Sequence, residues 1–159
     1  MNDDTMRQVV LELLRGGQAH ISPDKALAGL PSDLRHARSG NAPHSIWEEL
    51  EHMRLAQEDI LRFTVEPSWK SPEWPAGYWP SPDSAPTDAM WSKTLAGFRA
   101  DLKAMCKLVE DRSIDLTAKI PHGEGQTYLR EALLVADHNA YHLGQIVQLR
   151  KLLGSDPKS

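Results

Sequence analysis

Apolar side chains recur along this chain at steps of three and four residues, the spacing that places them on one face of an α-helix. Four long segments show this pattern, at about residues 4–15, 46–66, 87–109 and 127–153. Proline- and glycine-containing stretches separate these segments. No stretch of the sequence shows the strict alternation of apolar and polar residues that is typical of a half-buried strand. The pattern predicts an all-α fold, most simply a four-helix bundle, and a single domain over residues 1–159.

The ends of several segments carry capping residues. Ser45 and Glu48 form the serine–glutamate pair of a capping box at the start of the second segment. Gly154 follows the last segment, in a position where glycine commonly ends a helix. Ser22 is expected to cap a short additional helix over residues 23–30, which begins with a proline.

The connection between the second and third segments is long and rich in proline. It covers residues 65–86 and carries Trp69, Trp74 and Trp79. A loop of this length in a compact domain is usually functional or disordered, and the tryptophans argue against disorder. We expect this loop to pack as a lid over one end of the bundle. A loop that only covers exposed core is the alternative.

Composition and charge narrow the class of protein. Apolar residues make up 40% of the chain and charged residues 25%, which is ordinary for a globular protein. The net charge of −4 argues against a nucleic-acid-binding surface. The N-terminus lacks the pattern of a signal peptide, and no apolar run is long enough for a membrane span. The single cysteine, Cys106, suits a reducing compartment, so we expect a cytoplasmic protein.

The segment DHNAYHLGQ places two histidines four residues apart in the last predicted helix. On a helical wheel, His138 and His142 fall beside Val135 and Leu149, so both imidazoles are expected to point into the bundle. A buried polar ring without a partner costs about 1–3 kcal/mol, and one shared metal ion would satisfy both rings. Two core histidines bonded to carbonyls or carboxylates are the alternative. Asn139 stands where a zincin protease has glutamate, so that pattern is absent.

A third metal ligand would come from another helix. His52, at the edge of the apolar arc of the second predicted helix, is the candidate, and a half-exposed surface histidine is the alternative. Glu49 lies one turn earlier on the bundle side. It is a candidate metal ligand, a hydrogen-bond partner for an imidazole, or a member of a simple salt bridge. We also consider Glu49 the candidate for proton transfer.

Four further residues are candidates for the surroundings of this site. Gln145 and Glu131 lie on the last predicted helix near the histidine pair and would orient a ring or a bound water, with ordinary helix polarity as the alternative. His44 precedes the capping box and is expected near the site opening, or else exposed. Trp79 of the long loop is expected to shape the pocket.

Three stretches together resemble the DinB/YfiT-like superfamily of metalloenzymes: PHSIWEELEHM, GYWP and HNAYHLGQIVQLRKLLG. The likeness extends from the first predicted helix to Gly154, and its most specific part is the HxxxHxGQ segment. The resemblance implies a four-helix bundle in which His52, His138 and His142 hold one divalent metal ion, with zinc or nickel expected. It also implies a homodimer.

The resemblance implies enzymes of more than one kind. Members of the superfamily include transferases and isomerases that use low-molecular-weight thiols, and others are described as metal-dependent hydrolases. We therefore expect an enzyme that acts on a small-molecule substrate at an open metal position, first as a thiol-dependent transferase. A hydrolase that uses metal-bound hydroxide and a non-catalytic, stress-related metal- or ligand-binding bundle are the alternatives. The sequence shows no obvious cationic cluster for a charged thiol, which weighs against the transferase.

Overall fold

The computed structural model describes residues 3–83 and 85–157. Within them, no strand is present, and the regular structure consists of helices. There are five α-helices and two short 3-10 helices: α1 (Asp3–Arg15), α2 (Pro23–Leu27), η1 (Ser32–Leu34), α3 (Ile46–Val65), η2 (Ala76–Tyr78), α4 (Asp88–Glu110) and α5 (Tyr128–Leu152). The prediction of an all-α fold is confirmed.

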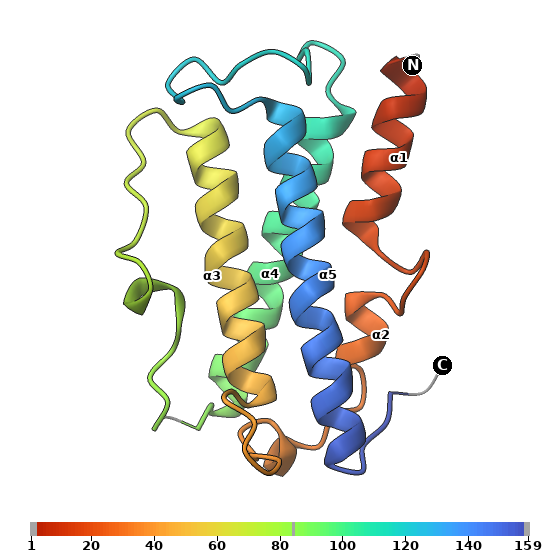
Figure 1. The fold of residues 1–159 in the computed structure, drawn as a ribbon, viewed down its shortest axis with the longest axis vertical. Coiled ribbons are helices and arrows are strands. Elements are labelled where there is room, and N and C mark those ends of the chain that lie inside the picture. Colours follow the sequence, from red (N-terminus) through yellow and green to blue (C-terminus); the bar gives the residue numbers. More distant parts are fainter. Residues whose placement is uncertain (1–2, 84, 158–159) are drawn as a thin grey trace.

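The long helices run side by side as a bundle (Figure 1). In the view of Figure 1, α5 lies between α3 and α1, and α4 lies behind them. The first helix, α1, covers only one half of the bundle's length, and the short α2 covers the other half (Figure 1). Both contact α5. The two helices α1 and α2 thus share one corner of the bundle, while α3 and α5 pack against each other along their length.

The start of α3 is fixed by the predicted capping box. The Ser45 hydroxyl accepts a hydrogen bond from the backbone N–H of Glu48, and the Glu48 carboxylate accepts one from the backbone N–H of Ser45 at 2.7 Å. These bonds satisfy backbone donors that a helix leaves unpaired in its first turn. Because Ser45 is buried, the cap also sets the depth and rotation at which the first turns of α3 meet α5.

The short helix α2 ends earlier than the sequence pattern predicts. Ser22 caps it as expected, but helical conformation stops at Leu27 rather than at residue 30. Ala28 is extended, and Gly29 has a φ of +63°, a left-handed conformation that glycine adopts without strain. The turn lets Leu30 reach the core, where it is buried. The chain thus leaves the helical conformation after Leu27 and buries Leu30.

The long connection between α3 and α4 does not lie over an end of the bundle, so that prediction is wrong. It runs along the flank of α3 for much of the helix's length (Figure 1). The indole of Trp69 and the hydroxyl of Tyr78 both donate hydrogen bonds to Asp59 of α3. Trp74, in contrast, is 71% exposed and covers no core. The segment is therefore fastened to α3 by polar contacts rather than by burial of all its tryptophans.

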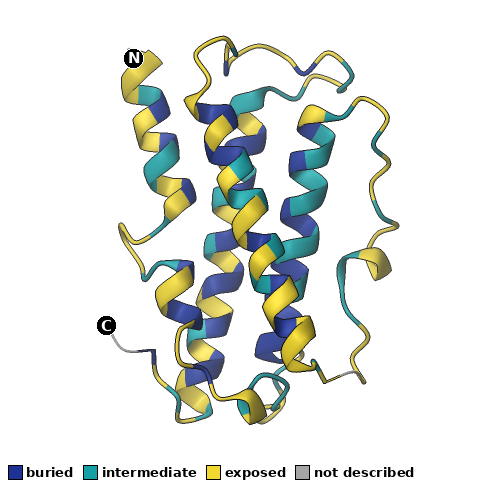
Figure 2. Cartoon of the chain, turned by 180° about the vertical axis from the view of Figure 1, so that it is seen from behind, coloured by how far each residue is buried: buried dark blue, intermediate teal, exposed yellow. Residues whose placement is uncertain are grey.

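The apolar interior consists of two clusters. One is built around Leu50, Phe98 and Ile146, and the other around Met105 and Val109. Figure 2 shows the corresponding buried stripes on the inward faces of the long helices.

Two buried amides cross the interior between α3, α4 and α5. Gln57 donates to the Phe98 carbonyl at 2.7 Å, and Asn139 donates to the Gln57 side chain at 2.8 Å. Since an unpaired buried amide is costly, these bonds fix how α3 and α5 are rotated relative to each other. Asn139 directly follows one of the candidate metal ligands on α5.

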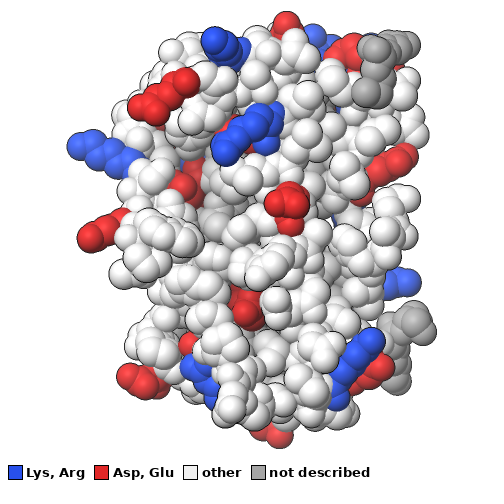
Figure 3. All heavy atoms as spheres, viewed as in Figure 1, with Lys and Arg blue, Asp and Glu red and all other residues white. Residues whose placement is uncertain are grey.

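Two properties of the surface are the hydropathy of its helices and the placement of its charged side chains (Figure 3). Among the described helices, none is both long and apolar enough to cross a membrane. Acidic and basic side chains are interspersed on the face shown in Figure 3.

Arg7 of α1 is a buried cation that fastens α1 to the end of α4. It is 6% exposed, and its guanidinium donates to the carbonyl oxygens of Val109, Asp111 and Ile114 at 2.7, 3.0 and 2.6 Å. Carbonyl groups at a helix C-terminus lack partners in their own helix and carry partial negative charge. The guanidinium therefore satisfies the end of α4 and the turn that follows it.

We predict that Arg7→Met lowers the free energy of unfolding by about 2–4 kcal/mol, because three carbonyl groups lose their donor. Urea unfolding followed by circular dichroism measures the change. Arg15→Met is the matched control, since Arg15 forms a largely exposed ion pair with Glu110 and should cost less than about 1 kcal/mol. Equal, small effects of both substitutions would contradict the structural role of Arg7.

Candidate metal centre

Three imidazoles meet between α3 and α5. His52 projects from α3, and His138 and His142 project from successive turns of α5. One nitrogen from each ring lies within 4.8 Å of the others, and Nε2 of His52 is 3.1 Å from Nε2 of His138. His52 and His142 are buried, and His138 is partly buried. The structure thus brings together the three histidines that the sequence singles out.

The His52 ring is oriented by a backbone carbonyl. Its Nδ1 lies 2.8 Å from the carbonyl oxygen of Tyr78, in the connection that follows α3. Because a carbonyl oxygen only accepts, Nδ1 carries the proton and Nε2 keeps a free lone pair. Burial lowers the pKa of His52, and this effect outweighs the opposite effect of the bond to Tyr78. His52 is 3% exposed, so it is not the half-exposed surface histidine of the alternative interpretation.

The His142 ring is oriented by a carboxylate. Its Nδ1 lies 2.6 Å from Oε2 of Glu49, which projects from α3 one turn before His52. In the neutral ring, donation of Nδ1–H to the carboxylate leaves Nε2 as the nitrogen with a free lone pair. Of the three roles considered for Glu49, the structure shows the hydrogen-bond partner of an imidazole. Glu49 itself is 5% exposed.

The donor set fits a divalent metal ion. A bare imidazole nitrogen accepts a hydrogen bond but cannot donate one, so two bare nitrogens cannot bond to each other. As neutral rings, His52 and His142 nevertheless both place a bare nitrogen in the same small cluster. Two nitrogens bound to one zinc ion at about 2.0–2.1 Å lie about 3.0–3.4 Å apart, and the 3.1 Å between His52 and His138 falls in this range. A carboxylate or carbonyl on the second ring nitrogen is the usual way in which proteins orient imidazole ligands. The three histidines are therefore positioned to bind a metal ion.

His138 differs from the other two rings. Its Nδ1 is buried and has no hydrogen-bond partner among the described residues. Burial, followed by the nearby His142 and His52, lowers the pKa of His138 to about 3. The ring is therefore neutral at physiological pH, as a metal ligand must be. Apart from its ring contacts, its only polar interaction within residues 3–83 and 85–157 is with His52 inside the cluster.

A three-ring stack covers one side of the site. The Trp79 ring lies between two imidazoles, with centroids 3.9 Å from His52 and 3.9 Å from His44. The planes of Trp79 and His52 differ by only 2°. On the other side, the Tyr141 ring meets His142 edge-on at 4.9 Å. The stack thus covers one face of the His52 ring, and the Tyr141 ring lies beside His142.

A cavity of about 270 Å³ opens beside His142. Its lining includes polar and aromatic side chains from α3, α5, the segment before α3 and the connection after it, namely His44, Glu49, Trp79, Tyr141, His142 and Gln145. Among the residues that the structure describes, no lysine or arginine lines it. A space of this size accommodates a small molecule or one end of a larger one.

Four of the five residues expected around the site are there. Glu49, Gln145, Trp79 and His44 line the cavity. The structure does not bring Glu131 to the site. This residue is 1% exposed and accepts a hydrogen bond from Arg130 at 2.6 Å. Seven residues along α5 separate Glu131 from His138, and two turns of helix amount to about 10 Å.

Three residues of the site do not emerge from sequence reasoning. Tyr78 contributes its backbone carbonyl, and no pattern of side chains reveals such a contact. Asp59 holds the connection in place, although its position two turns after His52 on the same helix face was an available signal. Tyr141 lies between the paired histidines in the sequence, on the outer side of the helix. It is 65% exposed and yet lines the cavity, a position that helical spacing does not indicate.

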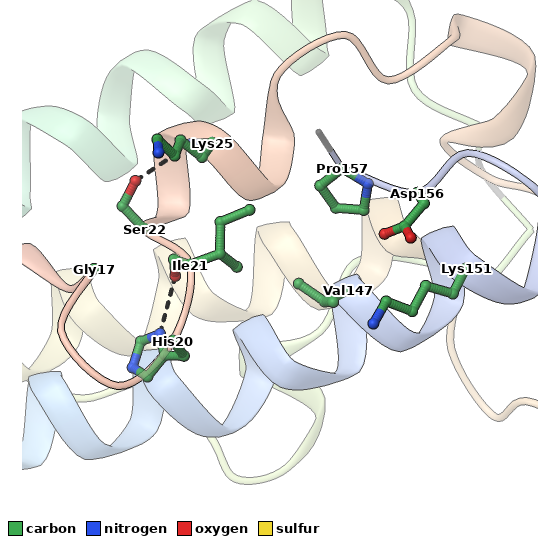
Figure 4. Close-up of a pocket in the computed structure, with 9 residues that line it drawn as sticks. All are labelled: Gly17, His20, Ile21, Ser22, Lys25, Val147, Lys151, Asp156 and Pro157. Atoms are coloured by element: carbon green, nitrogen blue, oxygen red, sulfur yellow. Dashed lines mark hydrogen bonds between the residues drawn. The ribbon is translucent and has the colours of Figure 1, made fainter. Parts of the chain in front are cut away.

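A larger cavity lies elsewhere on the molecule. It measures about 620 Å³ and is bounded by the α1–α2 connection, α2, α5 and the C-terminal segment (Figure 4). None of the three clustered histidines lines it. Its charged residues, Lys25, Lys151 and Asp156, include both signs and converge on no single point. The histidine cluster is therefore the candidate site, because it alone combines buried ligand atoms, oriented rings and an adjoining cavity.

Comparisons with known proteins point to one family. The sequence model of the DinB superfamily matches residues 24–146. This span includes α3, α4 and the part of α5 that carries His138 and His142. Searches of curated proteins and of solved structures gave no match.

The low pKa of His138 predicts how the metal-free protein responds to acid. The unfolded chain takes up a proton on His138 near pH 6.5, whereas the folded chain takes it up only near pH 3. Stability is therefore lost as the pH falls from about 6.5 toward 3. Between pH 7 and pH 5, His138→Leu should reduce the loss in the free energy of unfolding by about 1–2 kcal/mol. Urea unfolding in the presence of a chelator measures this, and an unchanged pH dependence would contradict the burial of His138 in neutral form.

Proposed function

Because the chain belongs to the DinB superfamily, we propose that His52, His138 and His142 bind one divalent metal ion, zinc or nickel, in a metal-dependent enzyme. The observation that carries the proposal is the convergence of three imidazoles, two of which have Nδ1 bonded to an oxygen outside the cluster. As neutral rings, His52 and His142 donate Nδ1–H to these oxygens and keep Nε2 free as a metal ligand. The substrate would be a small molecule that enters the cavity beside His142.

The ion would supply Lewis-acid activation of a nucleophile, since three imidazoles leave at least one coordination position open. The chain's own residues supply the rest. Trp79 and His44 form one wall of the cavity and restrict water. Gln145 and the Tyr141 hydroxyl are the uncharged polar groups available to orient a substrate.

Glu49 is the proposed proton acceptor. Its Oε2 accepts a hydrogen bond from Nδ1–H of His142, and no side chain of the described residues bonds to Oε1. Because Glu49 lines the cavity, its Oε1 is the proposed acceptor of a proton from an entering nucleophile.

The first proposed reaction is transfer to a low-molecular-weight thiol. The thiol sulfur attacks an electrophilic atom of the second substrate, and the leaving group departs with the bonding electron pair. The thiol proton passes to Oε1 of Glu49 and then to the leaving group. Hydrolysis, with water in place of the thiol, is the second candidate, and the absence of lysine and arginine from the cavity lining favours it over the use of a highly anionic thiol. A homodimer and a cytoplasmic location are further parts of the proposal.

We predict that the metal-free protein binds one equivalent of zinc or nickel. His52→Gln, His138→Gln and His142→Gln should each weaken binding by at least about 100-fold, because each removes one of three ligands. Competition with a chromophoric chelator measures the affinity. His20→Gln, which changes an exposed histidine outside the cluster, is the control and should bind as the wild type does. Undiminished binding by the His138→Gln protein would contradict the proposed site.

We predict that the metal-loaded protein turns over an aryl halide only when a thiol such as L-cysteine is added. Glu49→Gln should lower kcat by about 100-fold, because the amide oxygen still accepts from His142 but no group remains to take the thiol proton. Glu131→Gln makes the same change in a buried glutamate outside the site and should leave kcat unchanged.

Three outcomes separate the candidate functions. Turnover that needs thiol supports the transferase. Cleavage of an activated ester without thiol, equally sensitive to Glu49→Gln, supports the hydrolase. Tight metal binding without either reaction would contradict the enzymatic proposal and favour a metal-binding bundle.

A further inference from the structure

A single carboxylate fastens the connection that orients His52. Asp59 lies on α3 seven residues after His52, which is two helical turns along nearly the same face. Its Oδ1 accepts a hydrogen bond from the indole Nε1 of Trp69 at 2.7 Å. Its Oδ2 accepts one from the hydroxyl of Tyr78, also at 2.7 Å. Both oxygens of one carboxylate thus hold two points of a connection that otherwise has little buried apolar surface.

The second of these points leads directly to the metal centre. The carbonyl of Tyr78, the residue whose hydroxyl is held by Asp59, accepts the Nδ1–H of His52 at 2.8 Å. The next residue, Trp79, stacks on the His52 ring at 3.9 Å. A shift of this short stretch would remove both the acceptor and the stacking partner of His52.

We propose that Asp59 is a positioning residue of the metal centre, which holds His52 in its ligand orientation through Tyr78. The proposal rests on the proposed function insofar as it concerns metal affinity. It also makes a claim about the metal-free protein, namely that Asp59 maintains the Nδ1–H form of the His52 ring. Among the described residues, Asp59 bonds to Trp69 and Tyr78 rather than to the histidines, and it does not line the cavity, so we expect its effect to pass through the connection.

Asp59 forms two hydrogen bonds, one with Tyr78 and one with Trp69, and variants that remove each bond separately can be compared. Tyr78→Phe removes the hydroxyl bond on the branch that leads to His52. Trp69→Phe removes the indole bond on the branch that does not. Asp59→Ala removes both. Each of these variants loses polar contacts between the same connection and α3, so a general loosening of the connection would affect all of them.

We expect Asp59→Ala and Tyr78→Phe to weaken zinc binding by about tenfold, in the lower range for residues that orient a metal ligand. Trp69→Phe should weaken it by less than about twofold. The double variant Asp59→Ala/Tyr78→Phe should bind as Asp59→Ala does, because both substitutions interrupt one path. The absorption spectrum of the cobalt(II)-loaded Asp59→Ala protein should differ from that of the wild type, since the orientation of one ligand changes.

A measurement without metal keeps the proposal testable on its own. Nitrogen-15 NMR of the histidines in the chelator-treated protein should show His52 as the Nδ1–H form in the wild type and in Trp69→Phe. The same ring should become a mixture of the two forms in Asp59→Ala and Tyr78→Phe.

The outcomes separate the two proposals. Wild-type zinc affinity in Asp59→Ala, with loss of binding in His138→Gln, would overturn the role of Asp59 and leave the metal centre intact. Failure of the wild type to bind any divalent ion would overturn the metal centre, and the NMR comparison would then decide the role of Asp59. Multiplicative losses in the double variant would show that Asp59 does not act through Tyr78.

Discussion

The candidate site depends on two hydrogen bonds that point away from it. Nδ1 of His52 donates to a backbone carbonyl and Nδ1 of His142 donates to a carboxylate. Each bond decides which ring nitrogen carries the proton, so together they leave bare nitrogens on the side where the rings meet. The ligand character of the cluster therefore originates in its outer contacts.

Those outer contacts in turn depend on how α3 is placed. The capping box at Ser45 fixes the first turn of the helix, and Glu49 and His52 follow within the next two turns. Both then face α5, where His138 and His142 are separated by one turn. The bonded amides of Gln57 and Asn139 hold the rotation of the two helices deeper in the bundle. The capping box at Ser45 therefore helps to set the distance between His52 and His138, which are 86 residues apart in the chain.

The sequence was informative where structure is local or periodic. Helix positions, the capping box of α3 and the inward direction of His142 follow from side-chain spacing, and the structure agrees with them. The path of the connection after α3 does not follow from spacing, because it depends on two donors that reach Asp59 across many residues. For the same reason the burial of His52 was ambiguous, since the covering carbonyl and indole belong to that connection. Glu131 was expected near the site because it lies on the same face of α5 as the two histidines. It lies two helical turns before His138, which is too far along the helix to reach the cavity.

Glu49 joins ligand orientation to the proposed chemistry, because its two oxygens have separate tasks. Oε2 accepts a hydrogen bond from Nδ1–H of His142, whereas Oε1 has no side-chain partner among the described residues, and the residue lines the cavity. A carboxyl group that gains a proton on one oxygen still accepts a hydrogen bond on the other. Transfer of a substrate proton to Oε1 would therefore leave the His142 ring oriented as before. One side chain can thus take part in proton transfer without disturbing the imidazole that it orients.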